Sequence, residues 1–364
     1  MSLAPRPVMA LPIFGEPARR GRKMTAVQSS AFLKAVGAIA AVVSLLLGLN
    51  QITGVVQQLR IHHKEFSEAM TSGDRELQRG DHAAAFRSYK RAAELDPVDR
   101  DAQTQETRAA MLWLETVHAQ QDHSFTDVAN QLLPVLDSAL AKAKGPVAGD
   151  IMAHIAWANF LRYREGRREG INIDDNLKAA LAADPDNVYG HAMSGFWILW
   201  QRGDLRSAQS HFAAALGTGR VRPYVRELQL SALTNYDSAE NDAEALRVAN
   251  EVRKSGETMD ASLRQRIFWN NFTSRLHSRD RLVASLSVLS PQDTEATYDW
   301  LDDRPADAVK SSSRAFVEAN LSEIQGRRPE ALARYQALQK QLRHTDVAIA
   351  SAVDESVERL SHSH

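Results

Sequence analysis

The side chains best suited to acid–base chemistry are histidines and paired aspartates, and none of them falls into a catalytic spacing. His62 and His63 are adjacent, as are Asp302 and Asp303, so the members of each pair point about 100° apart on a helix. Acid–base work by two groups needs side chains that converge on one reacting atom. Three further histidines in helical contexts are more typical of packed or capping residues than of ligands: His154, His191 and His211.

Other reaction types lack their characteristic residues. The chain contains no cysteine, which excludes disulfides, thiolate catalysis and cysteine-based zinc sites. It also lacks the phosphate-loop, dinucleotide-binding, nucleophile-elbow and H-E-x-x-H motifs. We therefore expect no enzyme, no cofactor and no metal site. Because the 364 residues carry a formal net charge of -1, nucleic acid is not expected as a partner.

Tryptophan and arginine side chains offer a different chemistry, the binding of a peptide. The stretch SGFWILW places Trp197 and Trp200 three residues apart, and Arg162 lies on a preceding helical segment. Two tryptophans beside an arginine suit an extended peptide or an amphipathic helix. Two alternatives remain open. The tryptophans could be core residues like their neighbour Phe196, and the arginines of residues 162–168 could form a solvated turn.

The elements that must position these side chains are helices, since richness in Ala, Arg, Leu and Glu is typical of all-α chains. In GDHAAAFRSYKRAAELDP, a Gly-Asp turn at 80–81 precedes small residues at helical spacing around Tyr89, and Pro97 ends the helix. Ala69 and Gly73 present a matching small face on the preceding helix. Two such helices form an antiparallel hairpin that cannot bury its apolar sides alone.

The same pattern returns downstream. RGDLRSAQSHFAAALGTG (202–219) and QGRRPEALARYQALQKQL (325–342) repeat the glycine turn, with Phe212 and Tyr335 at the position of Tyr89, and NLKAALAADPDN (176–187) matches the end of the unit. These motifs resemble the tetratricopeptide repeat (TPR) family, whose unit is a helix-turn-helix of 34 residues. The best-matching units lie near residues 66–99, 154–187, 189–222 and 312–345. Weaker helical patterns look like degenerate units at about 108–118, 126–143, 221–233, 243–254 and 263–276, and Pro134 is expected to kink or split the second of these.

The resemblance implies an all-α, TPR-like α-solenoid of antiparallel helix pairs over residues 57–364. Such a solenoid uses its concave face to bind proteins or peptides. In the family, that face is lined by particular positions of each unit's first helix. Carried onto this chain, those positions are Arg162, Met193, Trp197, Trp200, Phe316 and Asn320. Residues 235–303 depart most from the repeat, so a small-ligand pocket is expected there if the chain has one.

An apolar segment precedes the repeats. No charged residue occurs between Lys34 and Arg60, and Ala35 to Val56 supply about the 20 residues that span a hydrocarbon core. Residues 1–34 are a basic tail, so the positive-inside rule places this tail in the cytoplasm and the solenoid on the far side, which is the periplasm in a Gram-negative host. A cleaved signal peptide and a buried core helix are the alternatives to a single transmembrane helix at 35–56.

Taken with the anchor, the resemblance implies a membrane-anchored scaffold or co-chaperone that binds proteins or peptides in a membrane complex. Secretion, envelope assembly and enzyme maturation are the processes in which we expect such a protein to act. The alternative is a sensor or regulatory subunit that binds a small ligand or a neighbouring membrane protein. An open groove would favour the scaffold, and a closed cavity with convergent polar groups the sensor. A hydrolase or transferase with helical accessory repeats would need a catalytic constellation that the sequence lacks.

Overall fold

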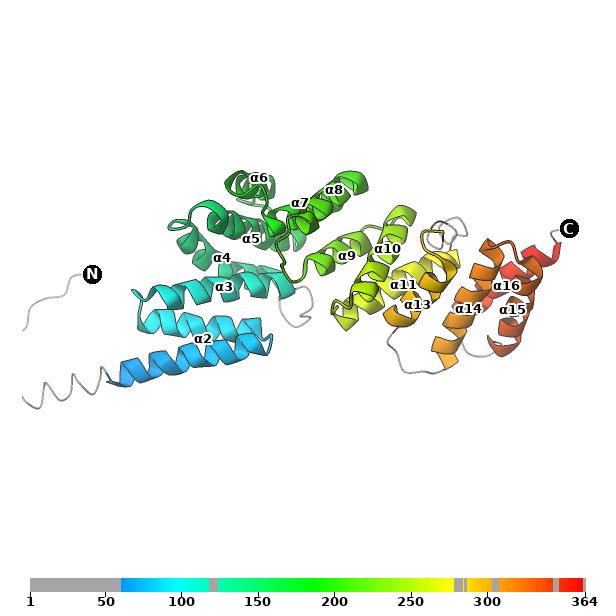
Figure 1. The fold of residues 1–364 in the computed structure, drawn as a ribbon, viewed down its shortest axis with the longest axis horizontal. Coiled ribbons are helices and arrows are strands. Elements are labelled where there is room, and N and C mark those ends of the chain that lie inside the picture. The colour runs from blue at the N-terminus through cyan, green and yellow to red at the C-terminus, as the bar shows by residue number, and fades with distance from the viewer. Residues whose placement is uncertain are drawn as a thin grey trace, which may run out of the picture. The chain divides into compact units, whose positions relative to one another are not determined.

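The computed structural model describes residues 60–117, 124–277, 284, 287–302, 308–342 and 347–362, and this part of the chain contains helices and no strand. The expectation of an all-α chain is confirmed to that extent (Figure 1). The chain divides into two compact units, with the boundary between Glu65 and Phe66. The second unit begins in a helical stretch that runs to residue 78 and continues with α2 (His82–Leu95), α3 (Arg100–Thr116), α4 (Phe125–Leu140), α5 (Gly145–Arg164), α6 (Ile173–Ala183), α7 (Val188–Arg202), α8 (Leu205–Gly217), α9 (Val225–Asn235), α10 (Ala239–Ser255), α11 (Ala261–His277), α13 (Pro291–Leu301), α14 (Ala308–Ile324), α15 (Arg328–Leu342) and α16 (Val347–His362).

The predicted transmembrane segment, Ala35 to Val56, lies outside the described residues. Within the ranges that the structure does describe, no helix is both long enough and apolar enough to cross a membrane.

Local sequence explains where the helices begin and end. Gly80, Gly203 and Gly326 adopt left-handed backbone conformations, with φ of 75°, 65° and 74°, and glycine enters this region without the steric cost that other residues carry. After the first two glycines, the carboxylates of Asp81 and Asp204 accept hydrogen bonds from backbone N–H groups in the first turn of α2 and α8. Each Gly-Asp pair therefore ends one helix and caps the next.

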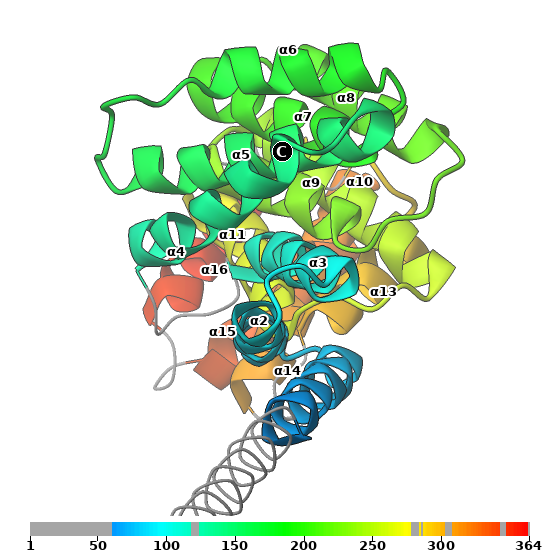
Figure 2. The same cartoon turned by 90° about the vertical axis from the view of Figure 1, so that its left-hand side faces the viewer.

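Pairs of consecutive helices pack face to face. The pairs α5 with α6, α7 with α8, and α14 with α15 are in extensive contact, as Figure 2 shows for the first of them. Small residues allow close approach. A Cβ atom on Gly73 would lie 2.7 Å from the ring of Tyr89, and one on Gly195 would lie 3.0 Å from the ring of Phe212. The predicted fit of a small face against an aromatic ring is thus present twice.

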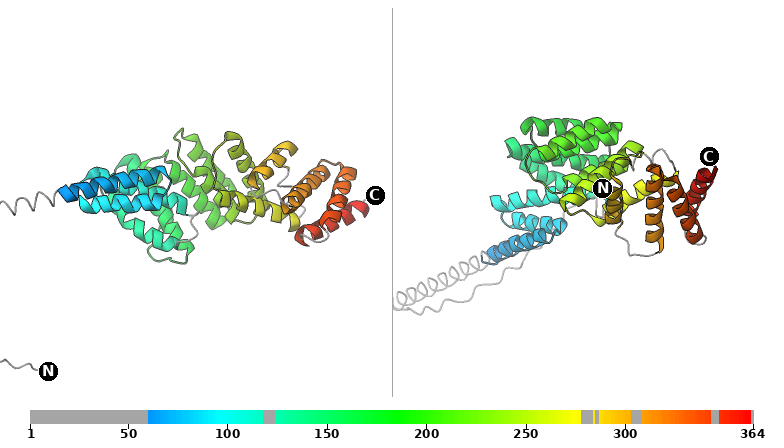
Figure 3. Two further views of the ribbon diagram at one scale, coloured as in Figure 1. Left: turned by 90° about the horizontal axis from the view of Figure 1, so that it is seen from below. Right: turned by 45° about the vertical axis from the view of Figure 1, so that its right-hand side comes forward.

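Successive pairs also contact one another. Helices α3, α5, α7, α9 and α11 each pack on the next member of this series, so side chains from alternate helices meet along one layer. At the carboxyl end of the chain, α14, α15 and α16 pack together (Figure 3). The weaker sequence patterns coincide with α3, α4, α9, α10 and α11.

The sequence led us to expect that Pro134 would kink or split its helix, and it does not split it. Helix α4 continues from Phe125 to Leu140 with Pro134 inside it. Proline removes one backbone hydrogen bond to the carbonyl four residues earlier. Both Pro134 and Asn130 are exposed, so that carbonyl can be hydrated, while buried Leu132 and Leu136 hold the opposite side of the helix in the core.

Candidate functional site

The two tryptophans of the predicted peptide site lie in an aromatic cluster between α5 and α7. The Trp197 side chain is 7% exposed, and its Nε1 donates a hydrogen bond to Asp174 Oδ1 at 3.2 Å. Its ring meets those of Phe160 and Tyr163 edge-on. Trp200 packs edge-on against Phe160 but remains only half-buried. Trp197 is therefore a core residue, and Trp200 is the tryptophan that reaches the surface.

Three other predicted contact positions on first helices are buried. Met193 on α7 is 1% exposed. On α14, Phe316 packs its ring against Tyr335, and Asn320 donates a hydrogen bond from Nδ2 to the Phe316 carbonyl at 2.8 Å. Both α14 side chains are buried and belong to a different helix pair from the tryptophans. In this conformation, these three residues offer no surface to a partner.

One arginine of α5 lies over the ring of Trp200, and a second lies two residues earlier on the same helix. Arg162 is half-buried, and its Nη1 donates a hydrogen bond to Asn159 Oδ1 at 3.3 Å. The Arg164 guanidinium lies over the ring of Phe125, 5.0 Å from its centroid, and over that of Trp200 at 5.8 Å. Stacking on two aromatic faces holds the guanidinium plane in place while leaving its edge open.

A further arginine, Arg266, lies on α11. Arg266 Nη2 donates a hydrogen bond to Ser231 Oγ on α9 at 3.0 Å. Asn270, one turn further along α11, donates to the Thr234 carbonyl at 2.9 Å and ties the two helices together. Burial lowers the pKa of Arg266, the nearby charge of Arg164 lowers it further, and Asp260 opposes both effects. Arg266 is therefore a half-buried arginine that a hydrogen bond holds against α9.

No carboxylate forms an ion pair with Arg162, Arg164 or Arg266 among the residues that the structure describes. The carboxylate next to Arg164 in the chain, Glu165, is engaged elsewhere. It accepts hydrogen bonds of 2.8 Å from the Phe125 and Thr126 backbone N–H groups and from the Ser124 hydroxyl. Burial alone would raise the pKa of Glu165, but these hydrogen bonds outweigh burial and lower that pKa to about 2. We call the set of Arg162, Arg164 and Trp200 the arginine face.

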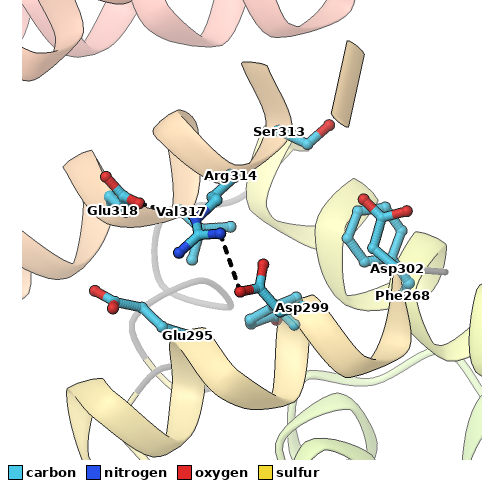
Figure 4. A pocket seen from close by; sticks show the side chains of 9 residues that line it. Phe268, Glu295, Asp299, Asp302, Ser313, Arg314, Val317 and Glu318 are labelled. Carbon is cyan, nitrogen blue, oxygen red and sulfur yellow. Dashed lines mark hydrogen bonds and ion pairs between the residues drawn. The ribbon is translucent and has the colours of Figure 1, made fainter. Parts of the chain in front are cut away.

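A separate hollow lies between α11, α13 and α14 (Figure 4). It encloses about 340 Å³, part of it open to solvent. Arg314 crosses it, with Nη1 3.1 Å from Asp299 Oδ2 and Nε 3.2 Å from Glu318 Oε1. Four carboxylates and two aromatic rings line the hollow beside this single arginine: Glu295, Asp299, Asp302, Glu318, Phe268 and Tyr298. It overlaps the end of residues 235–303, the region where the sequence departs most from the repeat.

A polar network is buried between α3, α5 and α7. His154 Nε2 lies 2.9 Å from Glu115 Oε1, and its Nδ1 lies 2.7 Å from the Asp150 carbonyl oxygen. The Tyr189 hydroxyl lies 2.6 Å from Glu115 Oε2. Burial by itself lowers the pKa of His154, but the hydrogen bond to Glu115 and the charge of that carboxylate outweigh burial and raise it. Hydrogen bonding at both ring nitrogens fits an imidazolium.

Two features escaped the sequence reasoning. Arg266 belongs to no sequence motif. It lies one turn after the buried Leu263 and directly before the buried Ile267, so helical spacing places it at the border of an apolar stripe. His191 and His211 come from different helices of one pair, and their Nδ1 atoms lie 3.2 Å apart. No group of three or more side chains able to hold a metal ion occurs among the residues described.

Comparisons with known proteins give distant similarity only. No family model matches the chain, and no curated protein matches it. Among solved structures, it is similar to the crystal structure of a tetratricopeptide repeat protein from Parabacteroides merdae, with a TM-score of 0.35 and 13% sequence identity over 82% of this chain and 99% of that one. This similarity is too distant to place the chain in a family.

Proposed function

We propose that this chain is a scaffold or co-chaperone that binds partner proteins and is tethered to a membrane by residues 35–56. The observation that carries the proposal is the arginine face. Its side chains come from α5 and α7, two members of the series in which each helix packs on the next. An array of this kind presents side chains from several helices to one extended partner.

The anchor and the helix pairs have complementary roles in this proposal. Tethering confines the binding surface to the membrane, which raises its effective concentration toward partners held in the same plane. The tail of residues 1–34 would lie in the cytoplasm and the helix pairs outside it, in the periplasm of a Gram-negative host. Secretion, envelope assembly and enzyme maturation are processes that use such a tethered scaffold.

Partner capture tests the scaffold directly. The full chain would be crosslinked in its own membranes and its partners compared with those of Trp200→Ala, the exposed tryptophan. Arg206→Ala on α8 serves as the control, because this exposed arginine lies outside the arginine face. We expect specific proteins with the unaltered chain and with Arg206→Ala, and fewer with Trp200→Ala. Capture of the same proteins by all three forms would place the binding surface elsewhere.

Membrane orientation has its own test. Because the chain contains no cysteine, single cysteines introduced as Ser30→Cys and Gln201→Cys report on each side without background. In intact spheroplasts, a membrane-impermeant maleimide is expected to label Gln201→Cys at once and Ser30→Cys only after lysis. Labelling in the reverse order would place the helix pairs in the cytoplasm.

The hollow between α13 and α14 supports the second candidate, a sensor subunit that binds a small ligand. Carboxylates outnumber arginine on its walls, and the rings of Phe268 and Tyr298 are present beside them, so a small amine is the ligand class that matches it. Thermal unfolding of the full chain with a panel of small primary and quaternary amines tests this candidate. A shift that Glu295→Gln abolishes would support it, and the lack of any shift would remove it.

A further inference from the structure

Two histidines face each other across the helix pair formed by α7 and α8. The Nδ1 atoms of His191 and His211 lie 3.2 Å apart, while the ring centroids are 5.4 Å apart, so the rings approach through these nitrogens and do not stack. Both side chains are half-buried. Since they lie 20 residues apart in the chain, no short spacing in the sequence indicates that they meet.

A backbone contact fixes which nitrogen of His191 carries the hydrogen. Its Nε2 lies 2.9 Å from the Pro185 carbonyl oxygen. Because a carbonyl oxygen can only accept, Nε2 donates to it, and the Nδ1 of the neutral ring keeps its lone pair. Histidines that bind metal ions almost always donate their other ring N–H to a carbonyl, a carboxylate or water. The Pro185 carbonyl therefore holds His191 in the tautomer and orientation of a metal ligand.

We propose that His191 and His211 bind a divalent late first-row transition-metal ion, Zn²⁺ in the first place, through their Nδ1 atoms. Imidazole nitrogen suits Zn²⁺, Cu²⁺ and Ni²⁺. With Zn–N bonds of about 2.0–2.1 Å, two nitrogens on a tetrahedral Zn²⁺ lie about 3.3 Å apart, close to the 3.2 Å between these two atoms. No third metal-binding side chain joins the pair among the described residues, so water fills the remaining positions.

This inference goes beyond the proposed scaffold function and does not depend on it. Without the ion, the same distance accommodates a hydrogen bond in which His211 Nδ1–H donates to His191 Nδ1. When the ion binds, that hydrogen moves to His211 Nε2, and both Nδ1 lone pairs are free for the ion. Because the two ligands come from different helices, the ion links α7 to α8 and stabilises the folded chain.

Isothermal titration calorimetry with the full chain, first treated with a chelator, tests the inference. The probe is ZnCl₂ at a pH of about 7.5, where most imidazoles are neutral. MgCl₂ is the control ion, since Mg²⁺ prefers oxygen ligands. We expect Zn²⁺ to bind and Mg²⁺ not to bind, and Zn²⁺ should raise the temperature of thermal unfolding. A chain that does not bind Zn²⁺ overturns the inference.

Three variants locate the site. His191→Gln and His211→Gln each remove one imidazole and keep much of the side-chain volume. Each is expected to weaken Zn²⁺ binding about tenfold or more, because loss of an outer-shell partner alone costs 10- to 100-fold. The matched control is the double variant His62→Gln/His63→Gln, which removes two exposed histidines and should bind like the unaltered chain. Unchanged binding by His191→Gln overturns the inference, and so does loss of binding in the control alone.

A measurement on the unaltered chain covers the case in which a histidine variant fails to fold, which circular dichroism detects. Diethyl pyrocarbonate modifies accessible imidazoles, and mass spectrometry assigns the modified positions. Added ZnCl₂ is expected to protect His191 and His211 and to leave His62 and His63 as reactive as before. Equal modification of His191 and His211 with and without Zn²⁺ would show that their contact is a hydrogen bond only, and would overturn the inference.

Discussion

At the scale of single residues, close packing depends on glycines, which have no side chain. Tyr89 is fully buried, and its ring fills the space that a side chain at position 73 would need. The Tyr89 hydroxyl also donates a hydrogen bond to Asp74 at 2.7 Å, which anchors the ring and limits its movement. The small residue before the turn and the aromatic residue after it therefore form a single packing contact.

Gly73→Val should test that contact. Its Cβ would lie 2.7 Å from the Tyr89 ring, and overpacking of this kind costs about 1–3 kcal/mol. Gly217→Val is the matched control, since nothing lies within 4 Å of its Cβ position in α8, and its effect should stay within about 0.5 kcal/mol. Urea unfolding of both variants measures the difference. Equal stability of the two would show that Tyr89 moves aside freely.

The buried pair of His154 and Glu115 predicts a dependence of stability on pH. The pKa of His154 is raised in the folded chain above its unfolded value of about 6.5. The stabilisation is therefore fully present below pH of about 6.5 and is lost as pH rises through the higher folded pKa. Burial lowers the pKa values of His82 and His211, so both are neutral in the folded and unfolded chain above that pH.

Unfolding free energies measured between pH of about 6.5 and 9 should accordingly fall for the unaltered chain. His154→Gln removes the titrating group and should flatten this part of the profile, at the cost of leaving Glu115 buried without its charged partner. Loss of one member of a buried pair costs about 3–5 kcal/mol. An identical pH profile in the variant would mean that His154 is not the group responsible.

At the scale of elements, one turn is used three times in different surroundings. Gly80, Gly203 and Gly326 share the left-handed conformation, but only the second is covered. A Cβ on Gly203 would lie 2.5 Å from the Tyr236 ring, whereas nothing lies within 4 Å of the Cβ positions of Gly80 and Gly326. The backbone requirement is thus common to all three turns, and the packing requirement belongs to the turn between α7 and α8.

Alanine at these turns should separate the two requirements. Gly80→Ala and Gly326→Ala are expected to cost about 1–2 kcal/mol each for the left-handed conformation. Gly203→Ala should cost more, because Tyr236 must also move. Thermal unfolding of Gly203→Ala with and without Tyr236→Ala measures the extra term as a double-mutant cycle. Additive effects of Gly203→Ala and Tyr236→Ala would exclude the packing contribution.

At the scale of the whole molecule, the main contacts run between helices that are neighbours along the chain or one pair apart. Stability in such an array is approximately a sum over units and the interfaces between neighbouring units. A cavity should then loosen its own pair and the adjacent helices while leaving distant pairs unchanged.

Leu338→Ala on α15 tests this locality, since Leu338 is 1% exposed. The cavity should cost about 2–5 kcal/mol, and hydrogen exchange measured by mass spectrometry should show lost protection in α14, α15 and α16. Protection of α5, α6, α7 and α8 is expected to stay unchanged. Equal loss of protection across all of these helices would show that the second unit unfolds as a single cooperative body.

The sequence by itself determined the helices, their turns and the small faces that pair them. The reason is that these features depend on neighbours a few residues apart, such as the Gly-Asp caps at Gly80 and Gly203. It also identified Trp200 and Arg162 as candidates for binding. Only the tertiary structure decided that Trp197 is core, because its exposure depends on Phe160 and Asp174 from other helices. Only the tertiary structure placed Arg164 over Phe125 and Trp200, because these rings come from α4 and α7, which no local pattern brings to α5.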